Sequence, residues 1–568
     1  MALTVTTDLT NITTAESGDT ANWDDVGSGS SAVTEPDFFV QGAACESRAV
    51  SNSKKGMCFN NGAGIDFTSG THQDKLVYIW VRINTPQLAD TIRNDGVTIR
   101  MSGSSSTTNY RDWAVDGSNT LPATEGWICY VVDPQSAGTV DNGTYDATSV
   151  QWFGAVTDMT TTAKGQNIGI DRISYGRGEI YVSGTVATAG EGFKEVADAI
   201  YDSALTNRWG IITVKQGIIY VKGKIIIGHA TANTTFSSYG ETVVFETGYY
   251  DNNTNVVKLV PDAGVGAVTG ADGLTSYNGL AFTGGSGTTN IDIGLIVGTD
   301  AGRSGSSFIC PDQAELTTPA KTLATVSVDN ATMALDLYGT SFKGFEGIVD
   351  LKGTGVNDDD CFGCTFDGCG RITTNMELRN CNIVNSVAIS TDGAMIWDDT
   401  MNVQSSLFAN NSRAIVFEAS TGTPFTFTDL SFSGNTFDVR NEIAVTDITI
   451  SYGTGSLPTN EDVSGSTTTL TGSVAVSITV VDKDDSPIAS AQTALYVGST
   501  EVLNGDTNGS GVISGSYSGS TPANAVWRSR KGSTGSTKYI ANSGPAVIAT
   551  TTGLAIKIVL LEDTNNAT

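Results

Sequence analysis

The chain has 568 residues, and 60 acidic against 31 basic side chains give it a formal charge of −29. Because single hydrophobic cores seldom grow beyond ~250–300 residues, this length predicts several domains. Charged residues make up 16 % of the chain and its 65 glycines far outnumber its 12 prolines, which favours a folded β protein over a disordered chain. The excess of carboxylates argues against nucleic-acid partners and anionic membranes. Two histidines, His72 and His229, are too few for a His-rich metal site.

The first ten residues, Met1–Thr10, have neither the basic nor the apolar segment of a secretory signal. No stretch of the sequence approaches the ~18 apolar residues that a membrane-spanning helix needs. We therefore expect a protein that folds in a cytoplasm and does not insert into membranes.

Residues 1–184 are predicted to form a jelly roll. Short runs rich in β-branched and aromatic residues alternate there with polar, Gly-rich turns, which is typical of sandwich folds. The clearest runs are Leu76–Ile83, Trp127–Asp133, Val150–Val156 and Ile168–Tyr175.

Three of these runs give the segment a likeness to a known family. It resembles the concanavalin-like (laminin-G-like) jelly roll in the Trp-led strand at Trp127, the Phe153-Gly154 strand, and the Ile170–Ile173 strand that ends in Tyr175-Gly176. Some lectins of that family bind calcium, so the resemblance makes Asp133 and Asp171 candidate ligands. The clustered Asp/Asn pattern of those lectins is not visible, however.

Residues 185–452 begin with the one clear helix of the sequence. In Gly192–Leu205 the apolar residues recur at the i, i+3, i+4 spacing of an amphipathic helix. Strand-like runs follow at once. A short helix ahead of a long β region resembles the cap of a parallel β-helix, which keeps the unpaired backbone groups of the open end away from solvent.

The rest of this region carries an irregular repeat. Five apolar anchors recur at separations of 24, 17, 25 and 24 residues, and each is followed two residues later by Gly or Asn, which tolerate left-handed turns. A strand and a turn every ~20–25 residues predict a right-handed parallel β-helix with the anchors stacked in its core. The anchors are Phe342, Phe366, Ile383, Phe408 and Phe432.

The last part of the chain, residues 453–568, divides into two segments of different composition. Residues 453–471 are rich in Gly, Ser and Thr and are expected to be a linker. Residues 472–568 contain about seven runs of strand character, which predicts an immunoglobulin-like β-sandwich and makes the whole chain all-β. They resemble the carboxypeptidase-regulatory-like sandwich, a structural and adhesive module, in Val481-Asp482, Pro487-Ile488, Ala491 and Thr507-Asn508-Gly509.

Four clustered cysteines follow the pattern C-x2-C-x4-C-x11-C. Four thiolates could hold a structural zinc ion, and pairs of thiols could form disulfides. The sequence favours a third alternative, a ladder of buried thiols, because Cys364 and Cys381 each lie two residues before an anchor. The pattern also lacks the second C-x2-C unit of zinc ribbons. The four are Cys361, Cys364, Cys369 and Cys381.

The densest carboxylate cluster is Asp358-Asp359-Asp360, with Asp367 close behind. Two carboxylates in a β-helix groove could hydrolyse a glycosidic bond, and several could bind calcium. A solvated turn between rungs is the favoured interpretation, since turns are rich in such residues. The sequence thus identifies no catalytic residue and no cofactor, and it leaves a metal site undecided. The same alternatives apply to Asp392, Asp398 and Asp399.

The predicted jelly roll, capped β-helix and terminal sandwich together resemble bacteriophage virion proteins of the tail-spike or fibre type. The resemblance implies a homotrimer on the virion, attached to other tail or capsid proteins and in contact with host-surface polysaccharide. A non-enzymatic structural adhesin is the favoured function. The alternatives are a capsid decoration or head-fibre protein and a polysaccharide depolymerase that acts in a β-helix groove.

A trimer of chains that each carry −29 needs large apolar contacts to outweigh the repulsion. Aromatic residues outside the anchor set could supply those contacts, or they could pack within their own chain. These candidates are Phe345, Trp397, Phe425 and Phe427.

Overall fold

The structure is a computed structural model of the whole chain. It describes residues 2–565 apart from gaps of one to three residues and the following longer gaps. These are 84–91, 117–125, 160–166, 201–210, 252–255, 259–278, 295–304, 311–324, 352–359, 389–392, 398–401 and 419–424. The chain divides into two compact units, one comprising Met1–Met376 with Ser386–Ala388 and the other Glu377–Asn385 with Ile389–Thr568.

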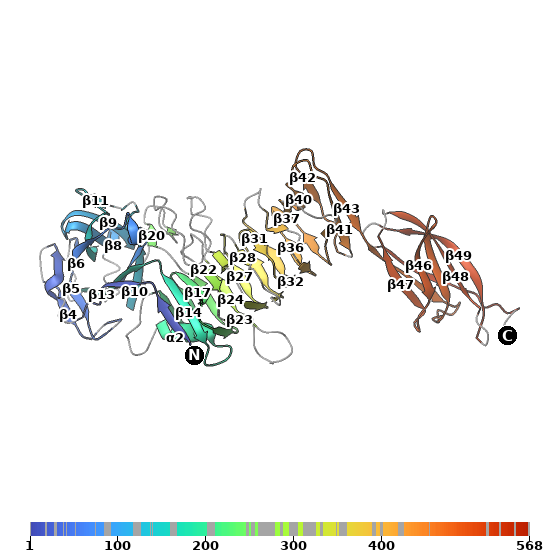
Figure 1. Cartoon of the computed structure of the whole chain (residues 1–568), viewed down its shortest axis with the longest axis horizontal. Coiled ribbons are helices and arrows are strands. Elements are labelled where there is room, and N and C mark those ends of the chain that lie inside the picture. Colours follow the sequence, from blue (N-terminus) through green and yellow to red (C-terminus); the bar gives the residue numbers. More distant parts are fainter. Residues whose placement is uncertain are drawn as a thin grey trace. The chain divides into compact units, whose positions relative to one another are not determined.

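The first unit begins with a sandwich of two antiparallel sheets of six strands each (Figure 1). The predicted runs at 76–83, 127–133, 150–156 and 168–175 coincide with strands β7, β10, β12 and β13. Their inward side chains form one core, which includes Ile79 and Phe153. One sheet contains β10 (Gly126–Val132), β7 (Leu76–Ile83), β13 (Asn167–Gly176), β5 (Cys45–Ala49), β4 (Val33–Glu35) and β2 (Thr10–Thr13). The other contains β11 (Val140–Asn142), β9 (Thr108–Asp116), β8 (Ile92–Ser105), β12 (Val150–Met159), β6 (Lys55–Ile65) and β3 (Trp23–Val26).

A partly buried carboxylate, that of Asp8, fixes the passage from this sandwich into the coil. Asp8 accepts hydrogen bonds from the backbone N–H of Arg177 (2.6 Å) and of Glu179 (2.9 Å) and pairs with the Lys75 ammonium at 3.1 Å. The next strand, β14 (Glu179–Thr185), pairs antiparallel with β1 (Thr4–Thr7) and parallel with β17 (Lys224–Gly228). The coil therefore grows directly out of the sandwich.

The coil in the first unit has three faces, each a parallel ladder that the chain visits in turn (Figure 1). Such a path is a parallel β-helix, as the repeat predicted. Face 1 contains β14, β17, β22 (Gly279–Thr283), β25 (Thr325–Asp329), β28 (Val349–Leu351) and β31 (Ile372–Thr374). Face 2 contains β18 (Thr234–Ser238), β23 (Thr289–Gly294), β26 (Ala334–Tyr338) and β29 (Asp360–Phe362). Face 3 contains β16 (Ile218–Val221), β19 (Thr242–Phe245), β24 (Ser307–Ile309), β27 (Ser341–Lys343) and β30 (Thr365–Asp367), with β15 (Ile212–Lys215) antiparallel to β16.

The second unit contains coils of the same three-faced kind. Face 1 has β34 (Met395–Trp397), β37 (Arg413–Phe417), β40 (Phe437–Asn441) and β42 (Asn460–Asp462). Face 2 has β32 (Glu377–Arg379) and β35 (Asn402–Gln404), and face 3 has β33 (Asn382–Val384), β36 (Leu407–Ala409) and β39 (Ser431–Ser433). A further parallel sheet is formed by β38 (Phe425–Thr426), β41 (Ile448–Gly453) and β43 (Thr468–Gly472).

Two of these strands correct the predicted linker at 453–471. β42 pairs with β40, and β43 pairs with β41, so the segment continues the ladders. Strands in a ladder pair through backbone groups, and polar side chains beside them can hydrogen-bond to one another or to the backbone. Asp438, for example, accepts hydrogen bonds from both the N–H (2.8 Å) and the hydroxyl (2.9 Å) of Thr459. A Gly/Ser/Thr-rich composition was therefore compatible with strands here.

The predicted anchors stack inside the coil. Ring centroids of Phe342 and Phe366 lie 5.3 Å apart with planes at 7°, and the rings of Phe408 and Phe432 lie 5.7 Å apart. Four anchors are almost fully buried, whereas Phe432 is only half-buried because it lies on the last strand of its ladder. The Gly or Asn two residues after each anchor has a positive φ between 54° and 73° in all five turns. These residues are Gly344, Gly368, Asn385, Asn410 and Gly434.

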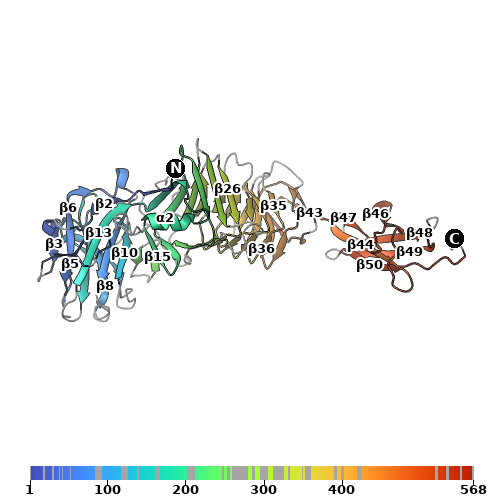
Figure 2. The same cartoon turned by 90° about the horizontal axis from the view of Figure 1, so that it is seen from below.

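The predicted cap is present. Helix α2 (Gly192–Ile200) lies at the start of the coil (Figure 2). Its Phe193 ring is 5.2 Å from both Phe236 and Phe308, which places the helix directly on the aromatic stack. The Phe193 N–H donates to the Ser238 hydroxyl at 2.9 Å, so a strand end satisfies one free donor of the first helical turn. None of the helices that the structure describes is both long and apolar enough to cross a membrane.

Residues 474–559 of the second unit form a seven-stranded sandwich. Its first sheet contains β47 (Val512–Tyr517), β44 (Val474–Val481) and β50 (Leu554–Val559). Its second sheet contains β46 (Thr500–Asp506), β45 (Gln492–Val497), β48 (Ala523–Lys531) and β49 (Tyr539–Ile548). An aliphatic core that includes Ile478, Leu495 and Ile558 joins the two sheets.

The aromatic residues proposed for a trimer contact are instead core residues. Phe345 packs on Phe342 and Phe245, and Trp397 lies 4.9 Å from Phe427. All four candidates, Phe345, Trp397, Phe425 and Phe427, are buried within their own chain.

Candidate functional site

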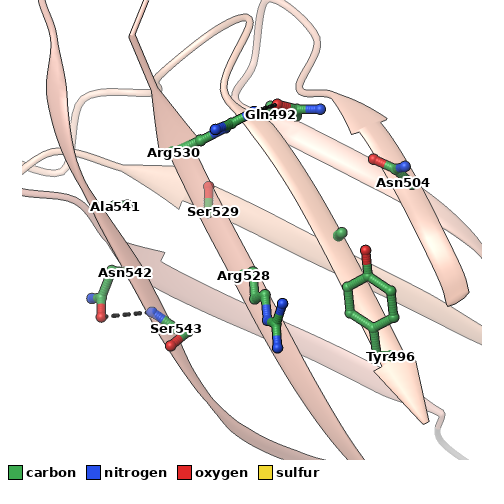
Figure 3. A pocket seen from close by; sticks show the side chains of 10 residues that line it. Gln492, Tyr496, Asn504, Arg528, Ser529, Arg530, Ala541, Asn542 and Ser543 are labelled. Atoms are coloured by element: carbon green, nitrogen blue, oxygen red, sulfur yellow. Dashed lines mark hydrogen bonds between the residues drawn. The ribbon is translucent and has the colours of Figure 1, made fainter. Parts of the chain in front are cut away.

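The outer face of the four-stranded sheet of the C-terminal sandwich forms a groove. Side chains alternate along β48, where Ala525 and Ser529 point inward, so Arg528 and Arg530 point outward. Figure 3 shows these arginines on one strand beside Tyr496 and Gln492 on the neighbouring strand. The groove has a volume of about 460 Å³. It is lined by Gln492, Ala494, Tyr496, Asn504, Arg528, Ser529, Arg530, Ala541, Asn542 and Ser543.

Contacts between neighbouring strands hold the groove side chains in place. The Arg530 guanidinium donates to the Gln492 Oε1 through Nε at 3.0 Å and Nη2 at 2.8 Å. The Arg528 guanidinium lies 5.4 Å from the centroid of the Tyr496 ring, within cation–π range. The Tyr496 hydroxyl donates to Glu501 at 3.1 Å, and this hydrogen bond raises the pKa of the phenol.

The groove combines one aromatic ring with amide, hydroxyl and guanidinium groups on rigid strands. Amides and hydroxyls both donate and accept hydrogen bonds, and guanidinium groups donate several at once. An aromatic ring adds an apolar surface with a polar tip. This combination suits a ligand with many hydroxyls and flat apolar faces, and the groove is open enough for an extended chain.

A second constellation lies on face 2 of the β-helix in the first unit. Register pairs Asp292 of β23 with Asp336 of β26, and it pairs Cys361 with Leu337, so Asp360 of β29 follows in the same column. Tyr338 and Phe362 form the neighbouring aromatic column, two residues further along the same face. We call Asp292, Asp336 and Asp360 the Asp column.

The first two members of the Asp column interact directly. Partial burial raises the pKa of Asp292, and a hydrogen bond with the Asp336 side chain lowers it in part. Carboxyl groups in direct contact are closer than the ~5 Å of retaining glycosidases and the ~6.5–9.5 Å of inverting ones. Asp292 and Asp336 alone therefore do not have the spacing of a hydrolytic pair.

The structure does not bring the predicted Asp cluster together around one site. Asp358 and Asp359 lie outside the described residues, as do Asp392, Asp398 and Asp399. Asp360 is on face 2, whereas Asp367 is on face 3, where its carboxylate lies 3.9 Å from the Lys343 ammonium.

The two candidate calcium ligands of the N-terminal sandwich are buried side chains that bind backbone groups. Asp133 accepts from the N–H of Gln135 at 2.8 Å and so closes the turn after β10. Asp171 accepts from the N–H of Val40. Within the described ranges, no three or more His, Cys, Asp or Glu side chains are grouped as metal ligands.

Three of the clustered cysteines, Cys364, Cys369 and Cys381, make hydrogen bonds at corners of the coil, whereas Cys361 lies within β29. All eight cysteines are buried thiols outside disulfides. Cys364 directly precedes β30 and donates to the Leu337 carbonyl at 3.2 Å, just as Thr340, directly before β27, donates to Ile293 at 3.3 Å. Cys381 holds the same place before β33, which agrees with the predicted equivalence. Burial raises the pKa of Cys369 to about 12, which disfavours the thiolate that zinc would require.

Neither histidine lies in a catalytic arrangement. The His229 Nδ1 accepts from the N–H of Thr231 (3.1 Å) and of Ala232 (3.0 Å) in an exposed turn. The His72 ring packs on Tyr175 with centroids 5.3 Å apart.

The sequence analysis missed both constellations that the structure assembles. Alternation in β45 and β48 was visible, but it does not show which strands are neighbours, so the convergence of Tyr496 with Arg528 could not be foreseen. Asp292 and Asp336 are 44 residues apart, although the chain makes only one coil between them, through β24 and β25. Their shared column was therefore hidden by the uneven repeat.

Comparisons with known proteins give weak likenesses only. No known protein family matches the sequence, and no curated protein matches it. The K2 cleaved adhesin domain of Lys-gingipain is 15 % identical, covers 30 % of this chain and 99 % of its own length, and has a TM-score of 0.19. The GH87 α-1,3-glucanase catalytic unit from Streptomyces thermodiastaticus strain HF3-3 is 9 % identical, covers 82 % of this chain and 90 % of its own, and has a TM-score of 0.21. These scores are too low to carry a conclusion about function.

Proposed function

We propose that this protein is a glycan-binding adhesin whose C-terminal sandwich binds polysaccharide in the groove of its four-stranded sheet. The observation that carries the proposal is the convergence of Tyr496, Gln492 and two arginines on one open, rigid face. Carbohydrate-binding faces need an aromatic surface and prearranged planar polar groups, and this groove has both. Binding needs no cofactor.

We further propose that the adhesin is displayed on a virion as a spike or fibre and assembles as a homotrimer. The support is the order of sandwich, capped β-helix and terminal sandwich, which resembles such proteins. Since Phe345 and Trp397 are core residues, a trimer would use other surfaces of the coil. Light scattering at micromolar concentration is expected to give three times the chain mass of 59.1 kDa, and a single-chain mass would overturn the trimer. Imaging of the particle distinguishes attachment to the tail from attachment to the capsid.

The adhesin proposal is tested by glycan binding of the full chain. Tyr496→Ala is expected to weaken binding by about fivefold to thirtyfold, as loss of a central interface residue does. Val559→Ala is the control, because Val559 is an exposed apolar residue (43 %) on the opposite sheet. If both variants bind as tightly as the wild type, the groove is not the binding site.

A second candidate function is hydrolysis of a polysaccharide at the Asp column. The observation in its favour is the raised pKa of Asp292, which is the property of a proton donor. Asp360 is two strands away from Asp292, so their backbones are about 9.6 Å apart at the usual strand spacing. That backbone separation is close to the carboxyl spacing of inverting enzymes, and Asp336 lies on the strand between the two. Tyr338 and Phe362 would flank the sugar.

We rank hydrolysis below adhesion because the described pair, Asp292 and Asp336, is in direct contact. Incubation with host-surface polysaccharide is expected to release no new reducing ends. Steady release that disappears in Asp292→Asn and Asp360→Asn, but persists in Asp367→Asn on face 3, would reverse the ranking.

A further inference from the structure

The C-terminal sandwich differs in charge from the rest of the chain. Residues 472–568 contain seven acidic and six basic side chains, so they hold one of the 29 net negative charges. Two of the six cations, Arg528 and Arg530, lie in the groove. The most nearly neutral part of an acidic protein thus directs positive charge into a groove.

These two arginines have no acidic partner in the part of the chain that the structure describes. Lys483 and Lys557 of the same sandwich, by contrast, pair with Asp484 (2.6 Å) and Asp485 (3.0 Å). Arg528 and Arg530 are two residues apart on one strand, so their side chains leave the same face with bases about 6.8 Å apart. Like charges so placed repel each other unless an anion lies between or over them.

The contacts of the two guanidinium groups leave donors free to face the groove. Arg530 uses Nε and one terminal nitrogen on the neutral Gln492 amide, which orients the group and does not cancel its charge. Arg528 lies over the Tyr496 ring, and this cation–π contact is an attraction of the charge to the ring face that does not require its N–H groups as hydrogen-bond donors. Guanidinium groups bind carboxylate, sulfate and phosphate through paired hydrogen bonds.

We infer that the groove selects an acidic polysaccharide, with Arg528 and Arg530 bound to its carboxylate, sulfate or phosphate groups and the Tyr496 ring against a sugar face. The inference rests on the proposed adhesin function and adds the chemical class of the glycan. The sandwich itself holds only one net negative charge, so it does not repel a polyanion strongly, and the adhesin proposal makes a polysaccharide the ligand to test against a nucleic acid.

The test uses the full-length chain and three acidic polysaccharides as probes: polygalacturonate, hyaluronate and heparin. Each uronate polymer is paired with its carboxyl-reduced, neutral counterpart, and single-stranded DNA serves as a non-glycan polyanion. Arg528→Gln and Arg530→Gln are each expected to weaken binding to the acidic probe by about tenfold. Lys557→Gln, which also removes one charge from the sandwich, is expected to change affinity less than twofold.

The outcomes distinguish failure of the acidic preference from failure of the adhesin proposal. Preference for an acidic probe over its neutral counterpart, lost in the arginine variants and weakened by salt, supports the inference. Equal binding of charged and neutral forms, sensitive to Tyr496→Ala alone, overturns the acidic preference and leaves the adhesin intact. Equal binding of DNA overturns the choice of a glycan. Binding of none of the probes at millimolar concentration overturns the inference, whereas the adhesin proposal is then decided by neutral polymers and Tyr496→Ala.

Discussion

The β-helix and the C-terminal sandwich use their β-strands in opposite ways. In the coil, short strands place their side chains in columns, and a buried column such as Phe308, Phe342 and Phe366 continues from one turn to the next at 5.3 Å. In the sandwich, the core is aliphatic and closes between two sheets, while the outer face of one sheet is left hollow and polar. The coil thus repeats the stacking of like side chains, whereas the outer face of the sandwich brings together side chains of different kinds.

The difference indicates which positions of each region are available for binding. Every inward position of the coil is constrained by the same position on neighbouring turns, so its sequence must repeat and its variation is confined to the outer faces and the turns. The groove of the sandwich needs only that Arg528, Arg530 and Tyr496 alternate outward on two paired strands. The following predictions test whether the two regions differ in this way.

The largest effect is expected within the aromatic column. Phe342→Ala should lower the free energy of unfolding of the coil by about 3–5 kcal/mol, because it leaves a cavity between two stacked rings. Phe432→Ala should cost no more than about half of that, since Phe432 is half-buried at the end of its ladder. Hydrogen exchange of the full chain measures both. Equal losses would show that the column does not depend on stacking from both sides.

Backbone contact between turns of the coil gives the next largest effect. A Cβ on Gly294, which has φ +83°, would lie 1.7 Å from the carbonyl oxygen of Tyr338 on the adjacent strand. Gly294→Ala should therefore cost about 2–3 kcal/mol or more, combining strain with a backbone clash. Gly498 in a sandwich hairpin has φ +59° and open space around its Cβ, so Gly498→Ala should cost only the strain of about 1–2 kcal/mol. A comparison of thermal unfolding that gave equal costs would refute the close approach.

A smaller effect is expected at the Asp column. The folded-state pKa of Asp292 is raised, so this group favours the folded state at low pH and loses that contribution as pH rises through the folded pKa. At neutral pH, Asp292→Asn should therefore raise the free energy of unfolding by about 1 kcal/mol or less, because it removes the desolvation penalty of a partly buried carboxylate. The gain should vanish below the unfolded pKa of about 3.9. Denaturant unfolding between pH 3 and pH 8 checks the sign, and a loss of stability at pH 7 would contradict it.

The smallest effect is expected at the cysteine corners. Cys369 donates to the Phe342 carbonyl at 3.4 Å, and burial holds its pKa near 12, so the thiol stays protonated at pH 8. Thiol reagents should label it only after unfolding, and a chelator should leave the unfolding temperature unchanged. Rapid labelling of the native chain, or destabilisation by a chelator, would revive the zinc alternative.

Most of the fold could be predicted from the sequence because the β-helix, its largest part, follows a repeating local pattern, whereas the groove of the sandwich does not. Phe342 and Phe408, each followed by a residue of positive φ, express a local rule that repeats, so the coil and its cap could be derived. The strand pairing in 453–471 could not be predicted, because the ladder is formed by backbone groups and the polar side chains of this segment are typical of a linker. The groove could not either, since Arg528 and Tyr496 become neighbours only through the pairing of β45 with β48.

The central claim, that this protein binds glycan through the outer face of its C-terminal sandwich, is tested most directly by hydrogen exchange of the full chain with and without a saturating acidic polysaccharide. We predict slowed exchange in β45, β48 and β49, with no change in β23, β26 and β29 on face 2 of the β-helix. Protection of β23, β26 and β29 in place of the sandwich strands would contradict the account and move the glycan site to the Asp column.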